Sequence, residues 1–163
     1  AMKPFRKRHY HRFGDFRRDV GVLLHGRREI KALSGGEPID KAFQERLMLA
    51  VTEVNGCRYC AYAHARMALS AGLTQADVDA LAGGSLDGAP PEQLPALLYA
   101  QHWAETDAEP EPEIQQRVLD TYGPQKARAI ELSLRMIRVG NLLGNTADYL
   151  LYRASWGRWG GGR

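Results

Sequence analysis

Two segments of this sequence are apolar on nearly every face of a helix, and they constrain the fold most. Residues 40–54 and 125–143 carry large aliphatic side chains on both sides of a helical repeat of about 3.6 residues. A helix that is apolar all round is usually buried inside a domain. No segment has the alternating pattern of a β-strand, and no internal repeat is present. We therefore predict an all-α bundle with these two helices at its centre.

Helix start and stop residues divide the rest of the chain into shorter helices. We predict these at residues 13–31, 57–71, 76–81, 92–106, 113–122 and 145–152. Asp40 is placed to cap the helix at 40–54, and Thr74 and Asp77 resemble a capping box for the helix at 76–81. A chain of 163 residues suits one domain. We predict a flexible basic arm at 1–12, a helical domain at 13–153 and a Gly-rich tail at 154–163.

Charge is uneven along the chain, although the net charge is only +3. Seven basic residues crowd the first eighteen positions: Lys3, Arg6, Lys7, Arg8, Arg12, Arg17 and Arg18. Such an arm can contact nucleic acid, but no nucleic-acid-binding motif follows it, so we favour a solvated arm or one packed on a neighbouring subunit. No apolar run spans a bilayer and no signal-peptide pattern opens the sequence, so we expect a cytoplasmic protein without a membrane partner.

The two cysteines of the chain, Cys57 and Cys60, form a Cys-x-x-Cys pair at a predicted helix start, with His64 one turn further on. In a reducing compartment such a pair is more often redox-catalytic or metal-binding than a structural disulfide. The helix N-terminus favours a thiolate at Cys57, whereas an imidazole four residues away favours Cys60. Contact with a proton acceptor is the more specific effect. We therefore predict that Cys60 attacks a peroxide and that Cys57 resolves the product.

Glu45 is the carboxylate that we expect to complete this group. It lies on the apolar helix at 40–54, where loss of hydration should raise its pKa and suit it to proton transfer. The predicted relay runs from Glu45 to His64 to Cys60. Glu53 is the rival carboxylate and ranks second, because the helix-ending Asn55-Gly56 lies between it and Cys57.

Two other interpretations of the cysteine pair stay open. Buried cysteines are often inert small hydrophobes, which would leave a non-catalytic helical assembly or binding module. A zinc site could use Cys57, Cys60 and His64, with a fourth ligand from Glu45, His25 or His102. Structural zinc sites usually show a second close pair of ligands, and this sequence has none. Spacing therefore favours redox chemistry over both.

The full motif, Glu45 followed after eleven residues by Cys57-x-x-Cys60-x-x-x-His64, resembles the alkylhydroperoxidase D-like proteins of the carboxymuconolactone decarboxylase family. The flanking segments Leu49-Ala50-Val51, Val54-Asn55-Gly56, Ala63-His64 and Gly72-Leu73-Thr74 support the resemblance. It is strong over residues 40–82 and looser over 135–148.

This resemblance implies a helical fold that forms homo-oligomers, often trimers or hexamers. It implies a thiol-dependent peroxidase for alkyl hydroperoxides, or a disulfide reductase, in which the second cysteine attacks and the first resolves. No cofactor is implied beyond the Cys57–Cys60 disulfide, which a dithiol or lipoyl-type reductant protein would reduce. Tyr59 stands where the best-studied peroxidase branch has a histidine, and it can still donate a hydrogen bond. The decarboxylase branch typically lacks this cysteine pair, which argues against lactone decarboxylation.

Overall fold

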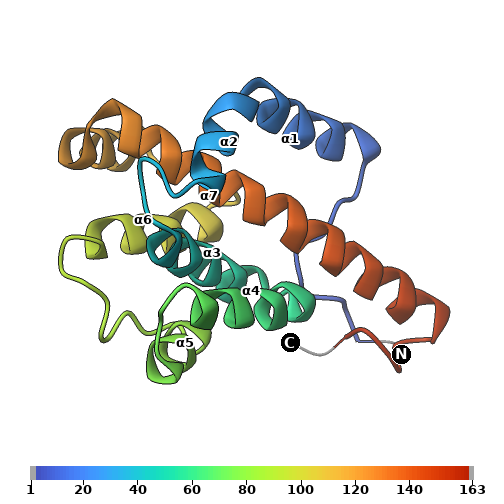
Figure 1. The fold of residues 1–163 in the computed structure, drawn as a ribbon. Helices are drawn as coiled ribbons and strands as arrows, with labels where there is room; N and C mark the ends of the chain where they lie inside the picture. Colours follow the sequence, from blue (N-terminus) through green and yellow to red (C-terminus); the bar gives the residue numbers. More distant parts are fainter. Residues whose placement is uncertain (1–2, 162–163) are drawn as a thin grey trace.

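The computed structural model describes residues 3–161, and over this range it contains seven helices and no strand (Figure 1). The helices are α1 (Phe13–His25), α2 (Arg27–Ser34), α3 (Lys41–Asn55), α4 (Arg58–Ser70), α5 (Gln75–Ala82), α6 (Leu94–Glu105) and α7 (Pro112–Ala154). The prediction of an all-α fold is confirmed. Over the same described range, no helix combines the length and apolar character needed to cross a membrane.

Helix α3 lies at the centre of the bundle and packs against α4, α5, α6 and α7. Its Leu47 and Val51 side chains are completely buried, as are Ile130 and Leu134 of α7. Both helices that the sequence marks as apolar all round therefore contribute the middle of the core, as predicted. Burial of each large aliphatic side chain contributes about 1.5–3 kcal/mol to folding.

Three local predictions around α3 and α5 are confirmed by the backbone. The Asp40 carboxylate accepts a 2.7 Å hydrogen bond from the Phe43 N–H and so caps the start of α3. Gly56 ends α3 in the left-handed conformation, with φ of 71°. Thr74 and Asp77 form the reciprocal hydrogen bonds of a capping box at the start of α5. The connection between α3 and α4 is therefore a short, fixed turn.

The helix predicted at 13–31 is wrong as a single element, because the chain breaks at Gly26 into α1 and α2. A Cβ atom at Gly26 would lie 2.7 Å from Cδ2 of Leu132 on α7. The junction of the two helices thus needs a residue without a side chain to approach α7 this closely. Helical periodicity continues through such a break, which explains why the sequence did not reveal it.

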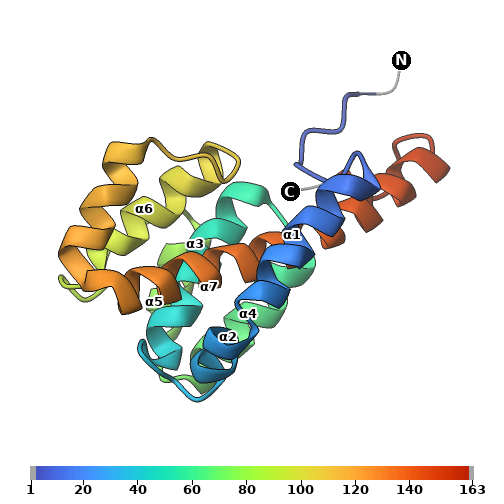
Figure 2. The ribbon, with the colours of Figure 1, turned by 90° about the horizontal axis from the view of Figure 1, so that it is seen from above.

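Helix α7 differs from the prediction at its C-terminal end. Its two parts, which correspond to the helices expected at 113–122 and 125–143, meet at a bend at Gly123, with φ of 75° and ψ of 168° (Figure 2). The separate helices expected at 125–143 and 145–152 are instead one continuous helix. The Asn145 amide donates to the carbonyl of Asn55 on α3, at 2.8 Å, rather than to its own backbone. A potential helix-ending residue therefore stays helical because its side chain has a tertiary partner.

The basic arm lies against the C-terminal half of α7 of its own chain. The Phe5 ring packs edge-on against Tyr149, with ring centres 5.4 Å apart. The carbonyl of Arg8 accepts a 2.8 Å hydrogen bond from Asn145, and the N–H of Tyr10 donates to Thr146 Oγ1 at 3.1 Å. The sequence led us to expect a free arm or one on a neighbouring subunit. Residues 1 and 2 of this arm, and 162 and 163 of the Gly-rich tail, lie outside the described residues.

Candidate active site

The turn between α3 and α4 places both cysteines on the first turn of α4. Cys57 is the N-cap of this helix, and its sulfur accepts a 3.3 Å hydrogen bond from the backbone N–H of Cys60. Gly56 in the left-handed conformation reverses the chain immediately before it. The free N–H groups and the partial positive charge of a helix start therefore surround the Cys57 sulfur.

The two thiols form a close pair pressed against α7. Their sulfur atoms lie 2.8 Å apart, and both cysteines are free. Cys57 is only 1% exposed, whereas Cys60 is partly exposed. A Cβ atom at Gly144 of α7 would lie 2.5 Å from the Cys57 sulfur, and one at Gly140 would lie 3.6 Å from the Cys60 sulfur. The pair fits because α7 has no side chain at position 144.

The geometry favours Cys57 as the thiolate of the resting pair. The hydrogen bond from the Cys60 thiol has the largest effect, and together with the backbone N–H groups of Cys60 and Tyr59 it lowers the pKa of Cys57 to about 6 against the opposing effect of burial. The pKa of Cys60 is raised because its thiol donates its proton in the hydrogen bond to Cys57 and is partly desolvated, while a hydrogen bond from Asn141 acts in the opposite direction. The helix-start argument thus describes the resting state, while exposure favours Cys60 for contact with a substrate.

Glu45 and His64 form a second polar pair at the α3–α4 interface. His64 Nδ1 lies 2.7 Å from Glu45 Oε2, and the Glu45 side chain is 6% exposed. This is the contact between α3 and α4 that the predicted relay requires. Among the described residues, no hydrogen bond joins His64 to Cys60. Of the predicted relay, the structure therefore contains the Glu45–His64 contact but no hydrogen bond from His64 to Cys60, whose partner is Cys57.

Tyr59, between the two cysteines, points its hydroxyl group at α7. It donates a 2.9 Å hydrogen bond to Asp148, a carboxylate with no exposed surface. Arg58 also binds Asp148, at 2.8 Å. The hydrogen bond that the sequence allowed for Tyr59 therefore exists, and its acceptor anchors the first turn of α4 to α7.

The remaining candidate residues lie elsewhere. Glu53 is exposed on α3, and its carboxylate lies beside Gly84. His25 binds the carbonyl of Gly21 on α1, and His102 pairs with Glu111. No group of three or more His, Cys, Asp or Glu side chains in residues 3–161 is arranged to hold a metal ion. The proposed zinc ligands are therefore not assembled in this part of the chain.

Comparison with known proteins shows that the segment with the candidate residues matches one family. A sequence model of the carboxymuconolactone decarboxylase family matches residues 26–106, which contain Glu45, both cysteines and His64. The chain belongs to this family. The family includes alkylhydroperoxidase D-like proteins, so the resemblance noted from the motif is confirmed at this level. No curated protein and no solved structure shows significant similarity to the chain.

The segment that matches the carboxymuconolactone decarboxylase family ends before α7, where the sequence interpretation missed three buried polar residues. Asn141, Asn145 and Asp148 have no exposed surface. Asn141 donates to Thr52 Oγ1 at 3.0 Å and accepts from Asn55 at 3.2 Å. Their spacing of four and three residues on an otherwise apolar helix was the available signal. Such a polar stripe inside a core needs partners, which here are α3, the arm and the first turn of α4.

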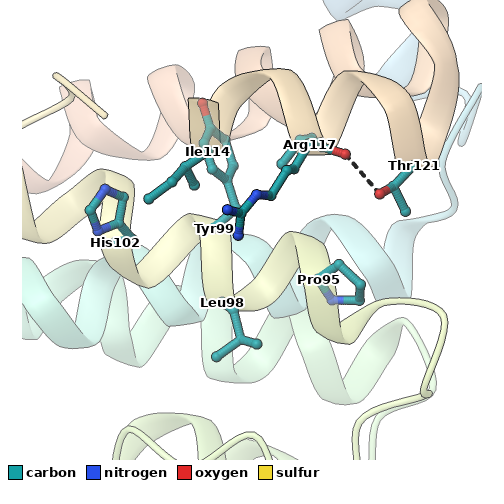
Figure 3. A pocket seen from close by; sticks show the side chains of 8 residues that line it. Pro95, Leu98, Tyr99, His102, Ile114, Arg117 and Thr121 are labelled. Atoms are coloured by element: carbon teal, nitrogen blue, oxygen red, sulfur yellow. Dashed lines mark hydrogen bonds between the residues drawn. The ribbon is translucent and has the colours of Figure 1, made fainter. Parts of the chain in front are cut away.

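A separate hollow lies between α6 and the first part of α7 (Figure 3). It has a volume of about 310 Å³. Its wall includes Leu98, Tyr99, His102, Ile114 and Arg117. None of the cysteine, glutamate or histidine residues of the motif lines it. The hollow is therefore separate from the cysteine pair.

Proposed function

We propose that the protein is a thiol-dependent peroxidase for alkyl hydroperoxides, or a disulfide reductase, acting through Cys57 and Cys60. The observation that carries this proposal is the pair of free sulfurs 2.8 Å apart at a helix start. A thiolate, rather than a thiol, attacks peroxides and disulfides. The hydrogen-bonded pair holds a thiolate near neutral pH, and membership of a family that includes peroxidases supports the same chemistry.

The first step is attack by Cys60 on a peroxide oxygen. The Cys60 proton passes to Cys57 across the short S···S contact, which leaves the thiolate on the more exposed sulfur. An S–O bond forms as the O–O bond breaks, so the sulfur is oxidised by two electrons to sulfenic acid and the peroxide is reduced to an alcohol. The leaving alkoxide takes a proton from His64, which Glu45 orients through its hydrogen bond.

The second step closes the disulfide. Cys57 attacks the Cys60 sulfur and gives its proton to the departing hydroxide, so an S–S bond forms, the S–O bond breaks and water leaves. An external dithiol, of the lipoyl type or on a reductant protein, then returns two electrons and two protons by thiol–disulfide exchange. This cycle needs no further cofactor. A reduced resting pair also suits a cytoplasmic protein.

We also propose that the chain forms a homo-oligomer. Several large apolar side chains are exposed on the single chain, including Tyr62 and Met67 on α4, Leu150 near the end of α7 and Trp156 just beyond it. Large exposed apolar surface commonly marks an interaction surface. Analytical ultracentrifugation of the full chain would give the subunit number, and a concentration-independent monomer would contradict this proposal.

The test of the catalytic proposal compares Cys60→Ser and Cys57→Ser in hydroperoxide consumption with a dithiol reductant. We expect both variants to lose turnover. Only Cys57→Ser should form a sulfenic acid that a sulfenic-acid-specific reagent traps, because it retains the attacking sulfur. Wild-type turnover in Cys60→Ser would refute the mechanism. Thiols that resist both peroxide and alkylating agents would instead favour a non-catalytic helical module.

A further inference from the structure

Asp148 is a buried carboxylate directly behind the cysteine turn. Its side chain has no exposed surface and accepts hydrogen bonds from Tyr59, Arg58 and Lys7, at 2.9, 2.8 and 2.9 Å. Burial alone would raise the pKa of Asp148, but the hydrogen bonds from Lys7, Tyr59 and Arg58 lower it overall. Asp148 is therefore an anion that binds both residues between the cysteines, Arg58 and Tyr59.

Lys7 reaches Asp148 from the basic arm and is almost completely covered. Its side chain is 6% exposed, and its methylene groups lie beside Gly56, the residue before Cys57. Asn145 fixes the arm at this place, because its amide donates both to the Arg8 carbonyl and to the Asn55 carbonyl, each at 2.8 Å. The arm, the end of α3 and α7 are thus joined at the turn that carries Cys57.

The charge of Asp148 opposes a thiolate at Cys57, since two negative charges close together disfavour one another. The charged groups around Cys57 are Arg58 on α4, Asp148 on α7 and Lys7 on the arm, with the titratable Tyr59 and Cys60 also on α4. Helix α3 adds the uncharged Asn55. Arg58 is 49% exposed, so solvent screens its charge far more than that of the covered Lys7. Lys7 is therefore the main group that balances Asp148.

We propose that Lys7 is a positioning residue of the redox site, acting through Asp148. By neutralising Asp148, it allows that carboxylate to anchor the first turn of α4 without opposing the Cys57 thiolate. The N-terminal arm is then part of the active centre and not a binding arm for nucleic acid. This inference rests on the proposed redox function. The quantity that it concerns is the pKa of Cys57, which is measured without any catalytic turnover.

The experiment measures the rate of alkylation by iodoacetamide against pH for the reduced full-length chain. Lys7→Met should raise the first pH midpoint by about one unit, since a nearby charge shifts a pKa by about 1–3 units. Asp148→Asn should lower it, because Lys7 is then left unbalanced beside Cys57. The double variant Lys7→Met/Asp148→Asn should return the midpoint towards that of the wild type. Lys7→Arg keeps the charge, and Lys3→Met alters an exposed lysine of the same arm, so both should match the wild type.

Three results would overturn the inference. The first is an unchanged midpoint in folded Lys7→Met, as judged by circular dichroism. The second is a midpoint that stays raised in the double variant, which would indicate displacement of the arm rather than lost charge. The third is a midpoint in Asp148→Asn equal to or above that of the wild type, which decides the matter even if Lys7→Met does not fold. If the midpoints shift as expected but neither the wild type nor any variant consumes peroxide, the proposed peroxidase function fails and this inference stands.

Discussion

Helices α4 and α7 both touch the sulfur pair, but they contribute different things to it. Helix α4 and its N-cap carry the candidate reactive groups, Cys57, Cys60 and His64. Helix α7 carries no nucleophile there, and instead supplies the space at Gly144 and the buried charge of Asp148. Reactivity is a property of residue type, whereas the state of a reactive group is set by its surroundings. The comparison implies that changes on α7 alter the thiols without removing any reacting atom.

Among the changes that test this comparison, we expect the largest loss of activity at Glu45, which lies on α3 and contacts His64 of α4. Glu45→Gln keeps a hydrogen-bonding partner for His64 but removes the carboxylate charge. We expect the rate of hydroperoxide reduction to fall by about a hundredfold, a typical loss for a general acid–base group. Steady-state kinetics with a dithiol reductant would measure it.

Glu53→Gln is the matched control for this experiment, since it makes the same change on the same helix at an exposed position. Its rate should equal that of the wild type. If the two variants lose activity equally, the Glu45–His64 pair has no special part in catalysis. The cysteines would then be the catalytic groups that remain.

The next effect tests whether α7 really limits the space of the sulfurs. Gly144→Ala would place a methyl group 2.5 Å from the Cys57 sulfur, so the thiol pair or α7 must shift. Overpacking of this kind costs about 1–3 kcal/mol, which exceeds the gain of about 0.5–1 kcal/mol from alanine in a helix. We therefore expect a lower free energy of unfolding in urea for the reduced protein.

Gly140→Ala provides the control on the same helix. Its methyl group would lie 3.6 Å from the Cys60 sulfur, which is ordinary van der Waals contact. This variant should be as stable as the wild type or slightly more stable. Equal destabilisation of both variants would show that α7 responds to any added methyl group, and not to the Cys57 sulfur in particular.

The smallest effect concerns the hydroxyl group that links the two helices. Tyr59→Phe removes the hydrogen bond to Asp148 but leaves those from Lys7 and Arg58. We expect a loss of about 1 kcal/mol or less in the free energy of unfolding. Tyr62→Phe, on the same helix and 68% exposed, should cost nothing measurable. A large loss in Tyr59→Phe would mean that Tyr59, rather than Lys7, dominates the environment of Asp148.

The sequence was sufficient for the parts of the fold that depend on local chemistry. The cap at Asp40, the end of α3 at Gly56 and the capping box at Thr74 were all predictable, because each uses only neighbouring residues. The break at Gly26 and the continuity of α7 through Asn145 were not predictable in this way. Each depends on a contact with a residue far along the chain, Leu132 in one case and Asn55 in the other.

The same division holds at the candidate site. The motif alone identified Glu45, Cys57, Cys60 and His64, since redox and proton-transfer chemistry need these residue types at helical spacing. Only the tertiary structure brought Asp148 and Lys7, which are 141 positions apart, to the cysteine turn. It also favoured Cys57 over Cys60 as the resting thiolate, because hydrogen bonds and nearby charges act through space. The sequence thus determined the candidate reactive groups, and packing decided which of the two thiols has the lower pKa.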